Sequence, residues 1–225
     1  MLVGNDVVDL RDPENQPEAI HTRFDLRVFG GGERARILDA KSPHRMRWAL
    51  WAAKESAYKV ARKMDPRVYF SPREFAVRLP RWEWGPHEAL VAEVLHAAGR
   101  FHVRLRGTDE WVHAVASTTG GGVETAGWDL RLVERAEAHG LIRFDPSARV
   151  RQLARSALAS ALSIVPSDIV IAAAAKRAPR AWWRGRRLAV DLSMSHHGRF
   201  VACAWGRIAD TITRGWDSGA GPPLP

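Results

Sequence analysis

The chain has 225 residues, of which 46% are hydrophobic and 26% are charged, as is typical of a globular protein with a sizeable core. A single cysteine, Cys203, and the lack of any apolar run near 18 residues exclude a disulfide framework, a cysteine-rich metal site and a transmembrane helix. The formal net charge of +9 favours an anionic partner: a polyphosphate ligand, an acidic protein, a nucleic acid or a membrane surface. No signal-like segment opens the chain, so we expect a cytoplasmic protein.

The first predicted element is a strand over residues 1–10, ended by the turn that contains Pro13. Gly4 in this strand permits the close approach of another backbone or a ligand. Asp6, which stands between an apolar residue and a Gly-Asn pair, is a candidate metal ligand. Residues 24–36 follow, with a flexible break of three glycines before Glu33.

A helix is predicted over residues 43–63, which contain no glycine and are rich in Ala, Arg, Lys and Leu. Glu55 and Lys59 are four residues apart in this helix and therefore share one face. Taken alone, such a pair is an ordinary helix-stabilising surface contact.

The next elements complete a first lobe over residues 1–116. Short segments of alternating or β-branched sequence predict an antiparallel meander, with strands at 74–79, 89–96, 101–105 and 111–116. Residues 117–127, which contain four glycines, are predicted to be a linker.

A second lobe is predicted over residues 128–215. A helix over 148–162 has a regular apolar face, and the single cysteine lies in a buried strand near the C-terminus. The expected elements are a strand at 128–133, a short helix at 134–139, the long helix, a strand at 169–171, a basic loop at 176–187 and a hairpin of 188–195 and 200–205 with its turn at 196–199; residues 216–225 form a disordered tail.

Three motifs together give the sequence its family resemblance. They are Val3-Gly4-Asn5-Asp6 in the first strand, Trp51-Ala52-Ala53-Lys54-Glu55-Ser56-Ala57-Tyr58-Lys59 in the first long helix, and Ser193-Met194-Ser195-His196 in the last hairpin. Their order and spacing resemble the strand G-x-D, the helix W-x-x-K-E-(A/S)-x-x-K and the strand S-x-S-H of the 4'-phosphopantetheinyl transferases. Each motif alone is weak, whereas the three together are fairly specific.

The resemblance implies an α+β fold of two similar lobes about a pseudo-twofold axis, each an antiparallel sheet packed on helices. In two-lobe members of the family the S-x-S-H motif precedes the other two, and here the order is reversed. Two hypotheses follow. The chain is either a circular permutation of the two-lobe form, joined through residues 117–127, or a single-lobe enzyme with a long insertion before its last strands.

The resemblance also implies an activity, the transfer of 4'-phosphopantetheine from coenzyme A to a serine of an acyl or peptidyl carrier protein, with release of 3',5'-ADP. Asp6 and Glu55 match the family's Mg²⁺ ligands, and Mg²⁺ suits a site of few carboxylates plus phosphate oxygens. Glu55, or a water that it holds, is the candidate base. Lys59 would neutralise phosphate charge, with Lys54 assisting. Where two-lobe members have a third acid, this chain has Val8, and strand alternation makes Asp9 a doubtful substitute.

Coenzyme A contacts are expected from several further residues. His196, with Ser195, matches the motif that contacts a phosphate of coenzyme A, although a histidine in a hairpin turn has an ordinary structural explanation. Arg149 and Arg151 are candidates for the 3'-phosphate, because arginine can grip phosphate with two hydrogen bonds. Arg177 falls where larger members have a loop near the nucleotide.

Two alternatives to catalysis remain at this point. A basic nucleic-acid-binding module fits the charge and the ten tryptophans, but it leaves Asp6, Glu55, Lys59 and His196 without a purpose. A non-catalytic member that binds coenzyme A or a carrier is the other. The transferase interpretation predicts a monomer whose partners are coenzyme A and a carrier protein, with no nucleic acid and no membrane.

Overall fold

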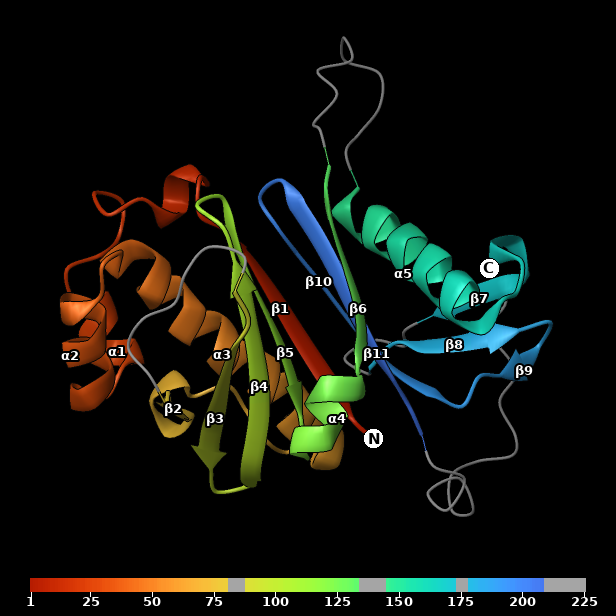
Figure 1. The fold of residues 1–225 in the computed structure, drawn as a ribbon, viewed down its shortest axis with the longest axis horizontal. Helices are drawn as coiled ribbons and strands as arrows, with labels where there is room; N and C mark the ends of the chain where they lie inside the picture. Colours follow the sequence, from red (N-terminus) through yellow and green to blue (C-terminus); the bar gives the residue numbers. More distant parts are fainter. Residues whose placement is uncertain (81–87, 134–144, 173–177, 209–225) are drawn as a thin grey trace, which may run out of the picture.

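The structure is a computed structural model, and it describes residues 1–80, 88–133, 145–172 and 178–208 (Figure 1). Its strands are β1 (Val3–Asp9), β2 (Ala76–Arg78), β3 (Leu90–His96), β4 (Gly99–Gly107), β5 (Trp111–Ser117), β6 (Gly127–Leu132), β7 (Ile169–Ala172), β8 (Arg180–Trp183), β9 (Arg186–Arg187), β10 (Val190–His197) and β11 (Phe200–Arg207). The helices are α1 (Phe24–Val28), α2 (Gly31–Asp39), α3 (Pro43–Met64), α4 (Gly120–Thr125) and α5 (Pro146–Leu162).

The first half of the chain forms a five-stranded antiparallel sheet in the order β1-β5-β4-β3-β2, with α3 across one face. Ser42 caps the first turn of α3 by accepting a hydrogen bond from the Arg45 N–H, and Pro43 occupies the first helical position. Gly4 of β1 faces this helix, and a Cβ there would lie 2.0 Å from the Ser56 carbonyl oxygen. Glycine therefore sets the close contact between β1 and α3.

The second half forms an antiparallel sheet in the order β10-β11-β6 and a smaller one in the order β7-β8-β9. Helix α5 packs on β11, β10 and β6 through an apolar stripe that includes Leu153, Ala157 and Leu158. Asp145 caps this helix by accepting from the Ser147 N–H, and Ser163 ends it in the left-handed conformation.

The two larger sheets pack against each other, so that α3 and α5 lie on the outside of a layered sandwich (Figure 1). The sheet contact is made by β1 against β10 and β11, where Val7 meets Phe200 and Ala202, and Val3 meets Ala204. The fold is therefore α+β with antiparallel sheets packed on helices, as predicted.

Most predicted elements are present, and the exceptions have local causes. The glycines at 30–32 are no flexible break, since Gly30 caps α2 and donates its N–H to the Glu33 carboxylate at 2.7 Å. Residues 117–127 hold helix α4, capped by Thr119, and the basic loop at 176–187 contains strands β8 and β9. His196 belongs to β10 and pairs with Val201, so the hairpin turn is shorter than predicted.

Several predictions concern segments outside the described residues or a division into lobes that stays untested. The helix at 134–139 and the tail at 216–225 fall outside the described residues. The division into lobes at 1–116 and 128–215 stays a prediction. No helix in the described ranges has both the length and the apolar character required to span a bilayer.

Two ion pairs tie β1 and α3 to the β10–β11 hairpin. The Lys63 ammonium lies 2.7 Å from Asp191 Oδ2 and also donates to the carbonyls of Val3 and Leu192. The Asp9 carboxylate, 1% exposed, accepts from both Nε and Nη2 of Arg199 at 2.8 Å. The side chains of Lys63, Asp191 and Asp9 are largely shielded from water, so removal of the partner of any of them leaves a charge that is poorly compensated.

We expect Asp191→Ala to lower the free energy of unfolding by about 3 kcal/mol, because the Lys63 ammonium would keep its burial and lose its counter-ion. Urea denaturation of the full chain measures this. Asp65→Ala, which breaks the surface pair with Arg67, is the matched control and should leave stability near the wild-type value. Equal effects of the two substitutions would contradict the structural role of the Lys63–Asp191 pair.

Candidate functional site

The structure brings Asp6, Glu55 and Lys59 together at the contact between β1 and α3. The Lys59 ammonium lies 2.9 Å from Asp6 Oδ1 and 3.7 Å from Glu55 Oε1, and it donates to the Asn5 carbonyl at 2.8 Å. Asp6 reaches it because alternate residues of β1 face α3, and Glu55 because it stands one helical turn before Lys59. Two carboxylates from different elements thus share one cation.

Burial makes this charge cluster electrostatically unusual. The Asp6 side chain is 9% exposed, whereas those of Glu55 and Lys59 are 29% and 25% exposed. Burial, reinforced by the charge of Glu55, raises the pKa of Asp6 to about 7 despite the opposing Lys59 ammonium. Burial alone would lower the pKa of Lys59, but the two carboxylates outweigh it and raise this pKa.

His196 lies on the neighbouring strand β10 and belongs to the same electrostatic environment. His196 is an exposed residue. Three effects lower the pKa of its ring: partial desolvation, which is the largest, then the positive charge of Lys59, and then the charge of His197. The Asp145 carboxylate, which caps α5, acts in the opposite direction and favours a higher pKa. The Lys59 charge therefore influences the protonation of His196.

A comparison with family models decides which family this arrangement represents. The model described as the 4'-phosphopantetheinyl transferase superfamily matches residues 2–116, just over half of the chain. The chain belongs to the 4'-phosphopantetheinyl transferase superfamily. Members of this superfamily use coenzyme A and carrier proteins. The matched segment contains β1 and α3, which carry Asp6, Glu55 and Lys59. A search of curated proteins found no match.

Ser195 lies in a buried polar layer between the two larger sheets. Its hydroxyl accepts from Asn5 Nδ2 at 2.9 Å, and the Asn5 N–H donates to Ser193 Oγ at the same distance. Asn5 Nδ2 also lies 3.3 Å from His113 Nε2, and burial lowers the pKa of His113 to about 3, so this ring is neutral. These contacts orient β10 against β1, and with it His196.

Lys54 does not join the cluster. Its fully buried ammonium contacts both Glu33 carboxylate oxygens at 2.8 and 2.9 Å and donates to the carbonyls of Pro72 and Phe75. Burial lowers its pKa, and Glu33 opposes this. Five residues separate Lys54 from Lys59, which places them on different sides of α3. The structure thus gives Lys54 the role of fixing α2 and the segment before β2.

The three candidate arginines differ in their position. Arg149 stands one turn after Asp145 on exposed helix surface. Arg151, two residues on, points to another side of the helix, since such pairs do not face each other. Arg177 lies outside the described residues.

The residues fit a divalent cation held by two protein carboxylates. Asp6 and Glu55 are the pair, and each has a carboxylate oxygen close to the same ammonium group, at 2.9 and 3.7 Å. Val8 is buried in the core, and the Asp9 carboxylate is held by Arg199, so neither supplies a third ligand. Among the described residues no group of three or more potential ligands is present. Two carboxylates, with substrate phosphate and water, is a donor set that Mg²⁺ accepts.

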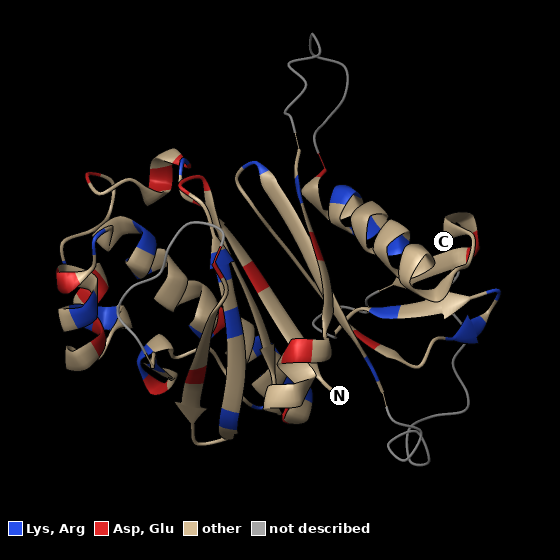
Figure 2. Cartoon of the chain, viewed as in Figure 1, with Lys and Arg blue, Asp and Glu red and all other residues tan. Residues whose placement is uncertain are grey.

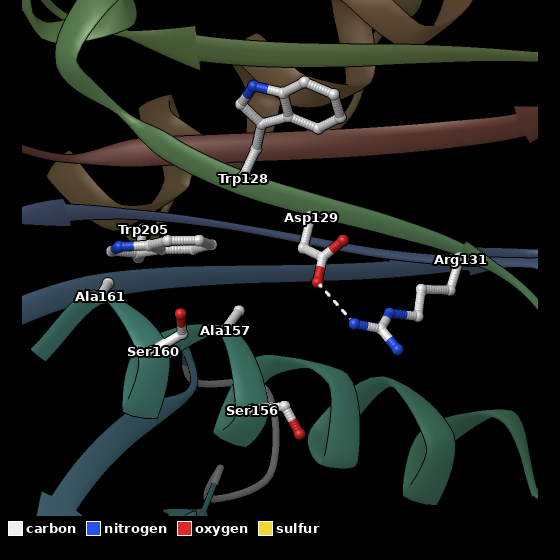
Figure 3. A pocket seen from close by; sticks show the side chains of 8 residues that line it. All are labelled: Trp128, Asp129, Arg131, Ser156, Ala157, Ser160, Ala161 and Trp205. Atoms are coloured by element: carbon white, nitrogen blue, oxygen red, sulfur yellow. Dashed lines mark ion pairs between the residues drawn. The ribbon is translucent and has the colours of Figure 1, made fainter. Parts of the chain in front are cut away.

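A separate hollow of about 270 Å³ lies between α5 and the β6–β11 edge (Figure 3). Trp205, Ser156, Ser160, Ala157 and Ala161 line it, with the Asp129–Arg131 pair at one end. None of the predicted site residues borders it. Figure 3 shows the Trp128 ring on the far side of β6 from the helix.

The contacts that support the site were not predicted from the sequence, although Asn5 and Ser193 belong to the quoted motifs. Asn5, Ser193, His113 and Asp191 act through contacts between segments more than 100 residues apart. Only Lys63 carried a local signal, because it continues the four-residue spacing of Glu55 and Lys59.

The raised pKa of Asp6 predicts a pH dependence of stability. Between its ordinary value of 3.8 and about 7 the folded state binds more protons at Asp6 than the unfolded chain, so the contribution of Asp6 to the unfolding free energy falls as pH rises. Asp6→Asn should remove this decline, which amounts to roughly 1–4 kcal/mol. Urea unfolding across this range, with chelator present, measures it.

Asp39→Asn, at the exposed end of α2, is the control for loss of a carboxylate. If wild type and Asp6→Asn lose stability in parallel over the same pH range, the Asp6 carboxyl titrates near its ordinary value and the prediction is wrong.

Proposed function

We propose that this chain is a Mg²⁺-dependent holo-carrier-protein synthase. It transfers 4'-phosphopantetheine from coenzyme A to a serine hydroxyl of a carrier protein and releases 3',5'-ADP. The observation that carries the proposal is the Asp6–Lys59–Glu55 cluster in a chain that belongs to this superfamily. Such a cluster combines two carboxylates, which could hold a metal or act as a base, with a positive charge between β1 and α3.

The reaction requires a nucleophile, a proton acceptor and charge stabilisation. The serine oxygen forms a bond to the β-phosphorus of coenzyme A, while the bond from that phosphorus to the bridging oxygen breaks and 3',5'-ADP leaves with the electron pair. Glu55 accepts the serine proton, directly or through a water, because its carboxylate is the more exposed of the two and can be reached from outside. Lys59 stabilises negative charge on the phosphoryl oxygens.

The proposed metal is held by Asp6 and Glu55. When bound, Mg²⁺ neutralises pyrophosphate oxygens and holds them in position for in-line attack. Lys59 then needs to release part of its contact with Asp6, which its long side chain and 25% exposure allow. The charge of Lys59 remains close enough to contact phosphate.

The coenzyme A phosphates are proposed to lie between His196 and the start of α5. The N-terminus of a helix attracts anions, and Arg149 adds a charged donor one turn further along. The net charge of +9 favours both anionic coenzyme A and an acidic carrier surface. A monomer suffices for this arrangement, because β1, α3, β10 and α5 belong to one chain.

The order of the motifs is best explained by circular permutation of a two-lobe enzyme. In support, each half of the chain places one long helix, α3 or α5, on the outer face of an antiparallel sheet. The residues proposed to join the former chain ends, 117–127, run from β5 through α4 into β6. A superposition of the two halves by a rotation near 180° would support permutation, and unrelated topologies would favour an insertion.

The central test is the intact mass of several apo carrier proteins after incubation with coenzyme A, Mg²⁺ and the full chain. We expect a mass gain of one phosphopantetheine group in the presence of Mg²⁺ and none with EDTA. Glu55→Gln should lower the rate by about 100-fold or more, because it removes the proposed base and one metal ligand. Lys59→Ala should lower it by a comparable factor.

Glu18→Gln, an exposed carboxylate far from α3 in the sequence, is the matched control and should react at the wild-type rate. Coenzyme A binding without transfer to any carrier would favour a non-catalytic member. A failure to bind coenzyme A would overturn the proposed function.

A second prediction uses stability rather than activity. Mg²⁺ should raise the melting temperature more at about pH 8 than at about pH 5.5, because metal and proton compete for Asp6. Asp6→Asn should abolish the shift, and Asp39→Asn should retain it. A shift that does not depend on pH or on Asp6 would place the metal elsewhere.

A further inference from the structure

Two arginines lie on the side of the first sheet opposite to the catalytic cluster. Arg104 and Arg106 alternate along β4 with Val103 and Leu105, which are fully buried in the core that includes α3. The register pairs Leu105 with Ala114 and Ala114 with Asp6, so these residues share the α3 side. Both guanidinium groups therefore face away from Asp6. Figure 2 shows the basic positions along β4.

Neither guanidinium has an acidic partner among the described residues. The Nε atoms of Arg104 and Arg106 are both buried and lack an acceptor. The strand's other arginine, Arg100, differs in this respect, because it forms an ion pair with Glu93 at 3.3 Å. Two adjacent cations with unused donors form a local excess of positive charge within the sheet surface.

The Trp128 ring orients one of the two groups. Arg106 Cζ lies 4.5 Å from the centroid of this ring, which β6 presents toward the first sheet. The same ring is 5.4 Å from His113, the neutral histidine that pairs with Arg106 across β4 and β5. Burial and the charge of Arg104 lower the pKa of Arg106, in agreement with two like charges held close together. Besides the buried Nε, the Arg106 guanidinium carries the N–H donors of its two terminal nitrogens.

We propose that Arg104 and Arg106, with Trp128 as a support, bind a phosphate-class oxyanion at a site distinct from the catalytic cluster. Residues two apart on a strand are about 7 Å apart, a span that one tetrahedral oxyanion or two linked phosphates bridge. Guanidinium donors recognise such oxygens with paired, charge-assisted hydrogen bonds. Inorganic phosphate and the phosphate of a nucleotide present the same chemistry, so the test includes both.

The experiment is a titration of the full, ¹⁵N-labelled chain with inorganic phosphate, followed on the arginine Nε–Hε resonances. Single Arg104→Gln and Arg106→Gln variants assign the two signals. We expect both signals to shift saturably with phosphate and not with chloride at equal ionic strength. In the double variant, followed on the indole N–H signal of Trp128, phosphate should bind at this site about 10-fold more weakly or worse.

Two matched variants separate this site from its surroundings. Arg100→Gln, on the same strand, should leave the Arg104 and Arg106 shifts unchanged, and His196→Ala should do the same. Adenosine monophosphate in place of phosphate shows whether a nucleotide is preferred. Equal shifts with chloride, no saturable shift, or a loss of the shifts in His196→Ala would overturn the proposal. The wild-type titration decides the matter alone if the double variant does not fold.

Discussion

Three lysine ammonium groups of one helix hold the parts of this protein together. Lys54 binds Glu33 of α2, Lys59 binds Asp6 of β1, and Lys63 binds Asp191 of β10. The positions of Lys59 and Lys63 on one side of α3 direct both toward β1 and the second sheet, and Lys54 points elsewhere. Each ammonium also donates hydrogen bonds to backbone carbonyls. These acceptors come together only in the folded chain, so only the folded chain stabilises the three buried or partly buried charges.

The exposure and the contacts of the lysine side chains distinguish the structural Lys54 from Lys59, the lysine that we propose contacts the substrate. Lys54 is fully buried and has four oxygen contacts, so it has no freedom to meet a substrate. Lys59 is a quarter exposed, and its two carboxylate contacts differ in length, 2.9 Å to Asp6 and 3.7 Å to Glu55. The longer and more exposed contact, between Lys59 and Glu55, is easier to exchange for a contact with phosphate or metal. Its electrostatic interaction is weaker, so less free energy is lost when it breaks. Helix α3 therefore carries a rigid lysine at its centre and a more adaptable one closer to its C-terminal end.

The two site residues of α3, Glu55 and Lys59, could be predicted from the sequence because they are only four residues apart. Glu55 and Lys59 share a face by helical geometry, and Asp6 was found through its place in a motif near Gly4. The role of Lys54 was not predictable in the same way, since its direction depends on Glu33, which lies 21 residues earlier. The network of Asn5, Ser193, Ser195 and His113 joins three strands that only the packing of two sheets brings together. Local patterns do not encode such contacts.

The same distinction applies to the glycine-rich segment at 117–127. Composition predicts a linker there and says nothing of its packing, whereas in the structure Gly122 packs against Ser117, Thr119 and the Met1 side chain, with a Cβ there only 2.5 Å from Ser117 Oγ. Likewise Gly127 lies under the Trp205 ring, where a Cβ would be 2.2 Å from the indole. At both positions glycine serves close packing. Residues 117–127 thus make a packed connection, and they set the position of β6 whose Trp128 ring supports Arg106 across the sheet contact.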